Sequence, residues 1–187
     1  GISPATGSGT GNISEALSSS NATPTVVTYV VVSTANGCSN TGENVTVTVQ
    51  PVPAVNVVSN QTLCNGSPTT AVTFSGVATQ YNWTNDTPSI GLAGSGVGNI
   101  PSFTSLNPGV NPVTATITIT PVYNGCTGTT TTFTITVNPT PVLTSTLTPA
   151  AICSGTSFIY TPSSATAGTT YAWSRAAVAG ISQAANS

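Results

Sequence analysis

The amino-acid sequence predicts an all-β chain, built of antiparallel β-sandwiches in tandem. Threonine and valine, which are β-branched and favour strands, dominate the 187 residues. Eighteen glycines and 14 prolines interrupt the chain throughout, as the turns between short strands do. In residues 113–120 and 132–137, apolar side chains alternate with threonine. That period of two is typical of a sheet with one buried face.

A repeat of about 88 residues organises the chain. The Gln-Pro-Val-Pro segment at residues 50–53 returns as Asn-Pro-Thr-Pro at residues 138–141, an offset of 138 − 50 = 88. Nearly the same offset relates three further pairs: Cys38 and Cys126, Cys64 and Cys153, and Trp83 and Trp173. The order of these landmarks predicts one complete unit and two partial ones. Residues 1–52 form the C-terminal part of a unit, 53–140 a complete unit and 141–187 the N-terminal part of a third.

Within the complete unit we expect six or seven short strands. The two alternating runs are separated by Asn124-Gly125, a strong hairpin signal. Earlier strands are expected around residues 72–74 and around Trp83. This number of strands in about 85 residues favours an immunoglobulin-like β-sandwich. Trp83 and its counterpart Trp173 are then expected to be core aromatics, packed between the sheets.

The charge count excludes most catalytic chemistry. The chain has one basic residue, Arg175, three acidic residues and no histidine. Without His or Lys it has neither a Ser-His-Asp nor a Cys-His pair, and no Schiff-base lysine. Three scattered acids cannot build a calcium cage, and one arginine cannot neutralise a phosphate backbone. We therefore expect no enzyme activity, cofactor or metal site, no nucleic-acid partner and, without a long apolar run, no transmembrane segment.

A few residues have both a functional and a structural interpretation. Asp86 stands alone beside Asn85, which indicates turn chemistry rather than catalysis. The glycine-rich residues 94–98 lack the lysine and the following helix of a phosphate loop, so a tight surface turn is expected. Tyr81 and Tyr123 are weak candidates for an aromatic sugar platform.

The four cysteines indicate disulfides in an oxidising, extracellular setting, since no histidine or close Cys-x₂-Cys pair suggests zinc. The count favours one bridge within the complete unit, between Cys64 and Cys126. In an immunoglobulin-like order, however, these residues lie near opposite ends of the sandwich. A bridge between neighbouring units is therefore the alternative. The partners of Cys38 and Cys153 are expected outside the sequence.

The motifs together resemble a known repeat family. They are Leu-Cys-Asn-Gly at residues 63–66, Tyr-Asn-Trp-Thr-Asn-Asp at 81–86, Asn-Gly-Cys-Thr-Gly at 124–128 and Phe-Thr-Ile-Thr-Val-Asn-Pro-Thr-Pro at 133–141. They resemble the PKD-like, immunoglobulin-like repeats of giant surface proteins of Bacteroidota, most of all those of gliding-motility adhesins of the SprB type. The resemblance covers the whole chain, as half, whole and half repeats.

This resemblance implies a non-catalytic segment of a very large secreted adhesin. It implies export by the type IX secretion machinery and a filament on the bacterial cell surface, attached to the outer membrane and used in attachment and gliding. The expected partners are neighbouring repeats of the same chain and a substratum or surface polysaccharide. The alternative is a carbohydrate-binding β-sandwich module of a secreted polysaccharide-degrading protein, which should show two or three coplanar exposed aromatic side chains.

Overall fold

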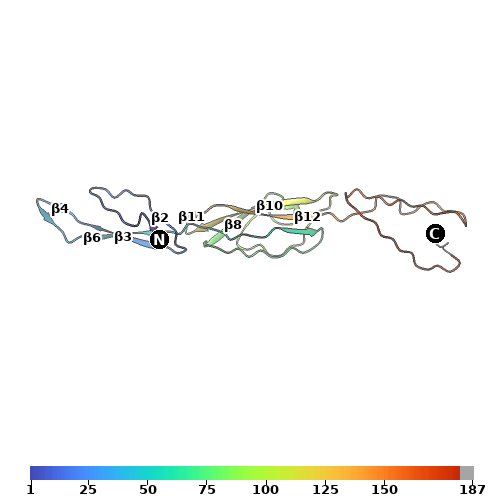
Figure 1. The fold of residues 1–187 in the computed structure, drawn as a ribbon, viewed down its shortest axis with the longest axis horizontal. Coiled ribbons are helices and arrows are strands. Elements are labelled where there is room, and N and C mark those ends of the chain that lie inside the picture. Colours follow the sequence, from blue (N-terminus) through green and yellow to red (C-terminus); the bar gives the residue numbers. More distant parts are fainter. Residues whose placement is uncertain (182–187) are drawn as a thin grey trace.

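The computed structural model describes residues 1–181, which are nearly all β or irregular. Three segments lie end to end in an elongated molecule (Figure 1). The first segment holds β1 (Ile2–Ser3), β2 (Ser18–Ser19), β3 (Thr25–Val31), β4 (Thr34–Ala35), β5 (Cys38–Ser39) and β6 (Glu43–Val49). The central segment holds β7 (Gln61–Cys64), β8 (Gln80–Asn85), the 3₁₀ turn η1 (Pro88–Ile90), β9 (Ser95–Val97), β10 (Val113–Tyr123), β11 (Cys126–Thr127) and β12 (Thr131–Asn138).

The central segment is built on one sheet with the strand order β7-β12-β10-β8-β9. Its pairs are antiparallel except that β7 runs parallel to β12. The predicted alternating runs form β10 and β12 in the middle of the sheet, where Ile117 pairs with Phe133. Asn124 and Gly125 both adopt positive φ, 44° and 87°, in the turn that joins β10 to β11. Two successive left-handed residues make the type I′ turn that Asn-Gly favours.

The layer that faces this sheet is made of extended segments rather than regular strands. Val72 and Ile100 form an isolated antiparallel bridge, and so do Pro68 and Thr104. Near the start of the segment, the Ala54 amide donates to the Val77 carbonyl at 2.8 Å. The central segment is therefore two-layered, with one regular sheet and one irregular layer.

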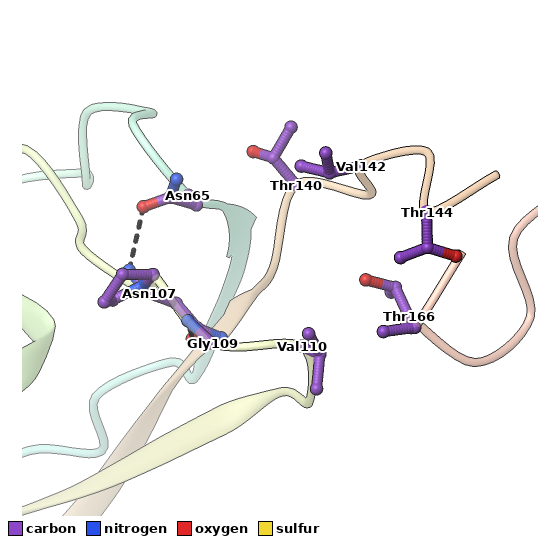
Figure 2. A pocket seen from close by; sticks show the side chains of 10 residues that line it. Asn65, Asn107, Gly109, Val110, Thr140, Val142, Thr144 and Thr166 are labelled. Carbon is purple, nitrogen blue, oxygen red and sulfur yellow. Dashed lines mark hydrogen bonds between the residues drawn. The ribbon is translucent and has the colours of Figure 1, made fainter. Parts of the chain in front are cut away.

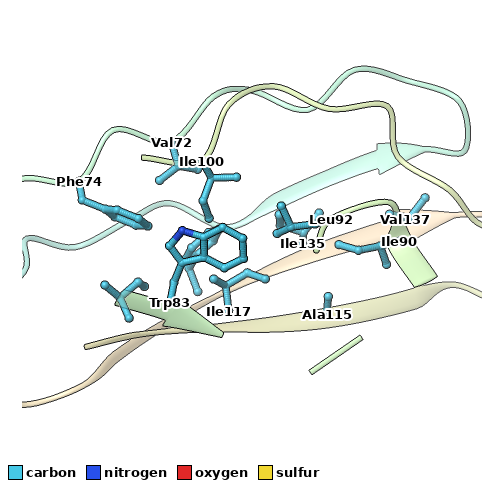
Figure 3. Close-up of a cluster of buried hydrophobic side chains, with 12 residues drawn as sticks. Val72, Phe74, Trp83, Ile90, Leu92, Ile100, Ala115, Ile117, Ile135 and Val137 are labelled. Atoms are coloured by element: carbon cyan, nitrogen blue, oxygen red, sulfur yellow. The ribbon is translucent and has the colours of Figure 1, made fainter. Parts of the chain in front are cut away.

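The hydrophobic core lies between these two layers (Figure 3). Trp83 from β8 is 7% exposed and lies at its centre, and its indole nitrogen donates to the Gly98 carbonyl at 3.1 Å. That bond satisfies the one polar group the indole buries. Burial of each aliphatic side chain contributes about 1.5–3 kcal/mol. The other buried members are Val72, Phe74, Ile90, Leu92, Ile100, Ala115, Ile117, Ile119, Phe133, Ile135 and Val137.

Gly96 leaves the space that Trp83 fills. The two residues pair across β8 and β9, and a Cβ atom on Gly96 would lie 2.2 Å from the Trp83 ring. We expect Gly96→Ala to destabilise the central segment by about 1–3 kcal/mol, the usual cost of overpacking. Gly9, one repeat earlier at 96 − 9 = 87, has no atom within 4 Å of its Cβ position, so Gly9→Ala is the matched control. Urea denaturation followed by Trp83 fluorescence measures both, and equal shifts would contradict the packing.

The first segment repeats the hairpin of the central one. Val27 pairs with Val47 in β3 and β6, as Ala115 pairs with Ile135 in β10 and β12, and 115 − 27 and 135 − 47 both equal 88. The turn between β4 and β5 again has positive φ at Asn-Gly, 50° and 80°. The 88-residue offset seen in the sequence is therefore also an offset in backbone pairing.

The third segment repeats a hydrogen bond found near the start of the central segment. The Thr144 amide donates to the Ser163 carbonyl at 2.7 Å, as the Asn56 amide donates to the Ser75 carbonyl at 2.8 Å. The two donors are 88 residues apart in sequence, and so are the two acceptors. No strand forms within residues 141–181, and residues 182–187 of the predicted third unit lie outside the described residues. Within residues 1–181 there is no helix of the length and apolarity that crossing a bilayer requires.

The prediction that Trp173 is a core aromatic is wrong for this structure. Trp173 is 82% exposed, whereas its counterpart Trp83 is 7% exposed. Trp83 is covered because β8 pairs with both β10 and β9, and the facing layer closes over it. Residues 141–181 contain no counterpart of β10 and β12. The core position is thus present in the third segment while the sheet that would bury it is not.

Candidate functional site

The features that meet neighbouring segments lie at the two ends of the central segment. The C-terminal pole consists of the turn at residues 64–67, the loop at 105–111 and the end of β12. The N-terminal pole consists of Pro53 and the hairpin at residues 121–128. Each pole carries one cysteine, Cys64 and Cys126 respectively, and both cysteines are exposed.

Buried amides hold the C-terminal pole together. The Asn107 side chain donates to the Val137 carbonyl at 2.7 Å and to the Asn111 carbonyl at 2.9 Å. Its backbone amide donates to Oδ1 of Asn65 at 2.8 Å, the bond drawn in Figure 2. Because a buried amide without partners costs about 1–3 kcal/mol, this network fixes the loop against the end of β12.

A second network fixes the turn that carries Cys64. The Ser105 hydroxyl is fully buried and lies 3.0 Å from the carbonyl oxygens of both Cys64 and Ser67. The Ser105 carbonyl accepts from the Gly66 amide at 2.8 Å, and the Asn138 carbonyl accepts from the Asn65 amide at 2.8 Å. The Cys64 backbone is therefore held rigidly beside the last residue of β12.

A cavity of about 240 Å³ separates the C-terminal pole from the third segment (Figure 2). Its walls are amides, hydroxyls and small apolar groups, and none of the lining side chains titrates. These groups can position a neighbouring backbone but offer no acid, base or nucleophile. The lining residues are Asn65, Asn107, Pro108, Gly109, Val110, Thr140, Val142, Thr144, Ala165 and Thr166.

The N-terminal pole is an extension of the central sheet. Thr79 anchors it, since its amide donates to the Val122 carbonyl at 2.8 Å and its hydroxyl accepts from the Asn124 amide at 3.3 Å. On the returning strand, a Cβ atom on Gly128 would lie 2.0 Å from the carbonyl oxygen of Pro53. Only glycine allows the hairpin to lie this close to the chain that enters the segment.

The predicted bridge between Cys64 and Cys126 is wrong for this structure. All four cysteines, Cys38, Cys64, Cys126 and Cys153, are free thiols. Cys64 pairs with Asn138 at one end of β12, whereas Cys126 precedes the other end of that strand and pairs with Tyr123. At a rise of about 3.3 Å per residue, β12 separates them by more than about 20 Å. A disulfide needs Cα atoms within about 7 Å.

Asp86 serves the turn after β8, as its sequence context indicates. Its Oδ1 accepts from the Thr116 amide at 2.7 Å and from the Thr87 hydroxyl at 2.9 Å. The hydrogen bond from Thr116, followed by that from Thr87, lowers the pKa of Asp86 below its ordinary 3.8. The carboxylate thereby links the turn to β10.

This linkage predicts a small acid sensitivity. Because the pKa of Asp86 is lower in the folded chain, its stabilising contribution is present above pH 3.8 and is lost as the pH falls through the folded value. We expect the free energy of unfolding to decrease over that range, and Asp86→Asn to make the decrease shallower. Urea denaturation at a series of acid pH values measures both chains. Parallel curves would contradict the assigned role.

The remaining candidates are structural. Tyr81 packs against Phe74 with ring centroids 5.6 Å apart, and burial raises its pKa. Tyr123 is also half-buried, so neither tyrosine offers the fully exposed ring that a sugar platform requires. Residues 95–97 form β9 rather than the predicted turn. The glycines of this segment predicted a turn, whereas Gly96 in fact makes room for the Trp83 ring. The signal that could have revealed the strand is that Gly96 and Trp83 each have a counterpart about one repeat away, in Gly9 and Trp173.

No family model matches the chain, and no curated protein matches it either.

Proposed function

We propose that the chain is a non-catalytic stretch of a tandem-repeat adhesin, exposed on a bacterial cell surface and used in attachment and gliding. Each unit would be a PKD-like, immunoglobulin-like β-sandwich. The observation that carries the proposal is the hairpin that recurs 88 residues apart with identical pairing (Val27 with Val47, Ala115 with Ile135), in segments that lie end to end (Figure 1). Such an arrangement extends reach, which is what a surface stalk requires.

The junctions support this proposal because they are short and proline-rich. Pro51 and Pro53 are buried where the first segment enters the central one. Before the third segment, Pro139 is buried in the same way, whereas Pro141, the counterpart of Pro53, is exposed. Proline has a fixed φ and reduces the number of accessible backbone conformations, which stiffens the junctions. The composition, with one basic residue and no histidine, is suited to a surface scaffold and offers little to acid–base catalysis.

The proposal is tested with antibody fragments raised against the 187-residue chain. We expect them to label intact source cells without permeabilisation and to slow attachment and movement on glass. Fragments raised against an internal protein of the same cells provide the control. Labelling that appears only after lysis would contradict a surface location, and labelling without any effect on attachment would contradict the adhesive role.

One observation favours the alternative, a carbohydrate-binding module. Trp173, Tyr171 and Phe158 are all exposed in the third segment. However, Tyr171 and Trp173 recur at the positions of Tyr81 and Trp83, which are largely core positions in the central segment. The experiment is retention of the chain on insoluble polysaccharides. Retention that is lost in Trp173→Ala would favour the sugar-binding module, and equal passage of both chains would favour the stalk.

A further inference from the structure

The two poles of the central segment each present a cysteine to whatever lies beyond that segment. Cys64 and Cys126 are exposed, although cysteine is among the residue types most often buried. Cys64 is also held rigidly. The buried Ser105 hydroxyl donates to the Cys64 and Ser67 carbonyls and so fixes the turn that carries Cys64. A rigid, exposed thiol at a junction is well placed to bond across it.

At the N-terminal pole, the hairpin runs back along the entering chain. Gly128 lies directly against Pro53, as the 2.0 Å approach of its Cβ position shows. Cys126 stands two residues before Gly128, and Pro51 stands two residues before Pro53. Both segments lead away from the central core in the same direction. Cys126 therefore lies level with Pro51, beside the preceding unit.

At the C-terminal pole, Cys64 lies next to Pro139, which is the counterpart of Pro51 one repeat later. Cys64 pairs with Asn138 in parallel register, and Pro139 follows directly. Pro139 is the counterpart of Pro51, since 139 − 51 = 88. In a tandem array the hairpin cysteine of the following unit thus reaches back to Pro139, one residue from the partner of Cys64.

We propose that a disulfide joins the Cys64 position of each unit to the Cys126 position of the following unit. The proposal rests on the tandem array proposed above. By the same rule, Cys38 bonds to the unit before its own and Cys153 to the unit after its own. Every bridge then spans one junction, and no two of the four cysteines in this chain are partners of one another. All four are free in the structure.

The bond forms by thiol–disulfide exchange with an oxidised dithiol protein or a small disulfide such as oxidised glutathione. The thiolate of one cysteine attacks a sulfur of the oxidant, and a mixed disulfide forms as one thiol leaves. The second cysteine thiolate then attacks the mixed disulfide and expels the second thiol. Two cysteine thiols are oxidised, the oxidant disulfide is reduced to two thiols, and protons balance on both sides.

The test duplicates the central unit inside the full chain, as residues 1–140 followed by residues 53–187. This order preserves a Pro-Thr-Pro junction between the copies. In the forward variant only Cys64 of the first copy and Cys126 of the second are kept, and every other cysteine is replaced by serine. The reversed variant keeps Cys126 of the first copy and Cys64 of the second, and so has the same composition.

Both variants are incubated with a mixture of oxidised and reduced glutathione, and free thiols are counted by maleimide labelling and intact mass. We expect the forward variant to lose both thiols while it remains monomeric, and the reversed variant to keep both. A third variant, with Cys64 and Cys126 in the same copy, is also expected to keep both. The proposal is overturned if the forward variant keeps its thiols while Trp83 fluorescence is native, or if either other variant closes as a monomer.

A non-reduced digest of the native surface protein gives a second reading that does not depend on folding of the enlarged chain. Cross-linked peptides that join a Leu-Cys-Asn-Gly segment to an Asn-Gly-Cys segment of the next unit are expected. Bridges within one unit, or free thiols throughout, would overturn the proposal. Neither outcome bears on whether the array exists, because the length of the native chain establishes that separately.

Discussion

Trp83→Ala is expected to destabilise the central segment by about 3–5 kcal/mol, the usual cost of removing a buried large aromatic side chain. The ring is 7% exposed, packs at the centre of the core and satisfies its nitrogen on Gly98. Because small domains have a total stability of about 5–15 kcal/mol, this loss is a large fraction of it. Urea denaturation followed by far-ultraviolet circular dichroism measures the change.

Trp173→Ala is the matched control, since it removes the same side chain at the same position of the next unit. Trp173 is 82% exposed, and its removal is expected to change stability by less than about 0.5 kcal/mol. Trp83→Phe retains most of the packing if the alanine variant does not fold. Equal shifts for the two alanine variants would contradict the location of the core in the central segment.

Ile135→Ala is expected to cost about 2–5 kcal/mol, because it leaves a cavity in a fully buried site. Ile135 lies on β12 between two neighbours, Ala115 of β10 and Gln61 of β7. The surrounding sheet cannot collapse into the cavity without disturbing both pairings. The transition is followed by the fluorescence of Trp83.

Val47→Ala provides the comparison, because Val47 occupies the position of Ile135 one repeat earlier. Val47 is 41% exposed, on a hairpin whose only hydrogen-bonded strands in the described residues are β3 and β6. We expect its removal to shift the Trp83 transition by less than about 0.5 kcal/mol. A shift as large as that of Ile135→Ala would show that the first and central segments unfold together, which the separate sheets do not predict.

Local patterns in the sequence were sufficient for the central hairpin of the fold. Alternation along β10 and β12 and the Asn124-Gly125 turn specify a hairpin, because side-chain period and turn chemistry depend on neighbouring residues. The irregular facing layer was not predicted as such, since segments such as residues 99–105 are held by isolated bridges and side-chain bonds. Their extended form depends on tertiary contacts that leave no period in the sequence.

In the candidate site too, features set by neighbouring residues could be predicted from the sequence, and features set by distant parts of the chain could not. The function of Asp86 in a turn follows from its neighbours, and the structure gives it bonds to Thr116 and Thr87. The partners of Cys64 and Cys126 depend on which end of the sheet each residue occupies. That is fixed by the parallel pairing of β7 with β12, a non-local feature. The burial of Trp173 likewise depends on strands far away in sequence, so composition and spacing could not settle it.

The length of the native polypeptide tests the proposed tandem array most directly. Antibody fragments against this chain identify the protein in the surface fraction of the source cells, and its mass is measured under reducing conditions. We predict a polypeptide of several hundred kDa, in which the 88-residue unit recurs many times. A native polypeptide near 18.4 kDa, the mass of this sequence, would contradict the array and with it the adhesive stalk.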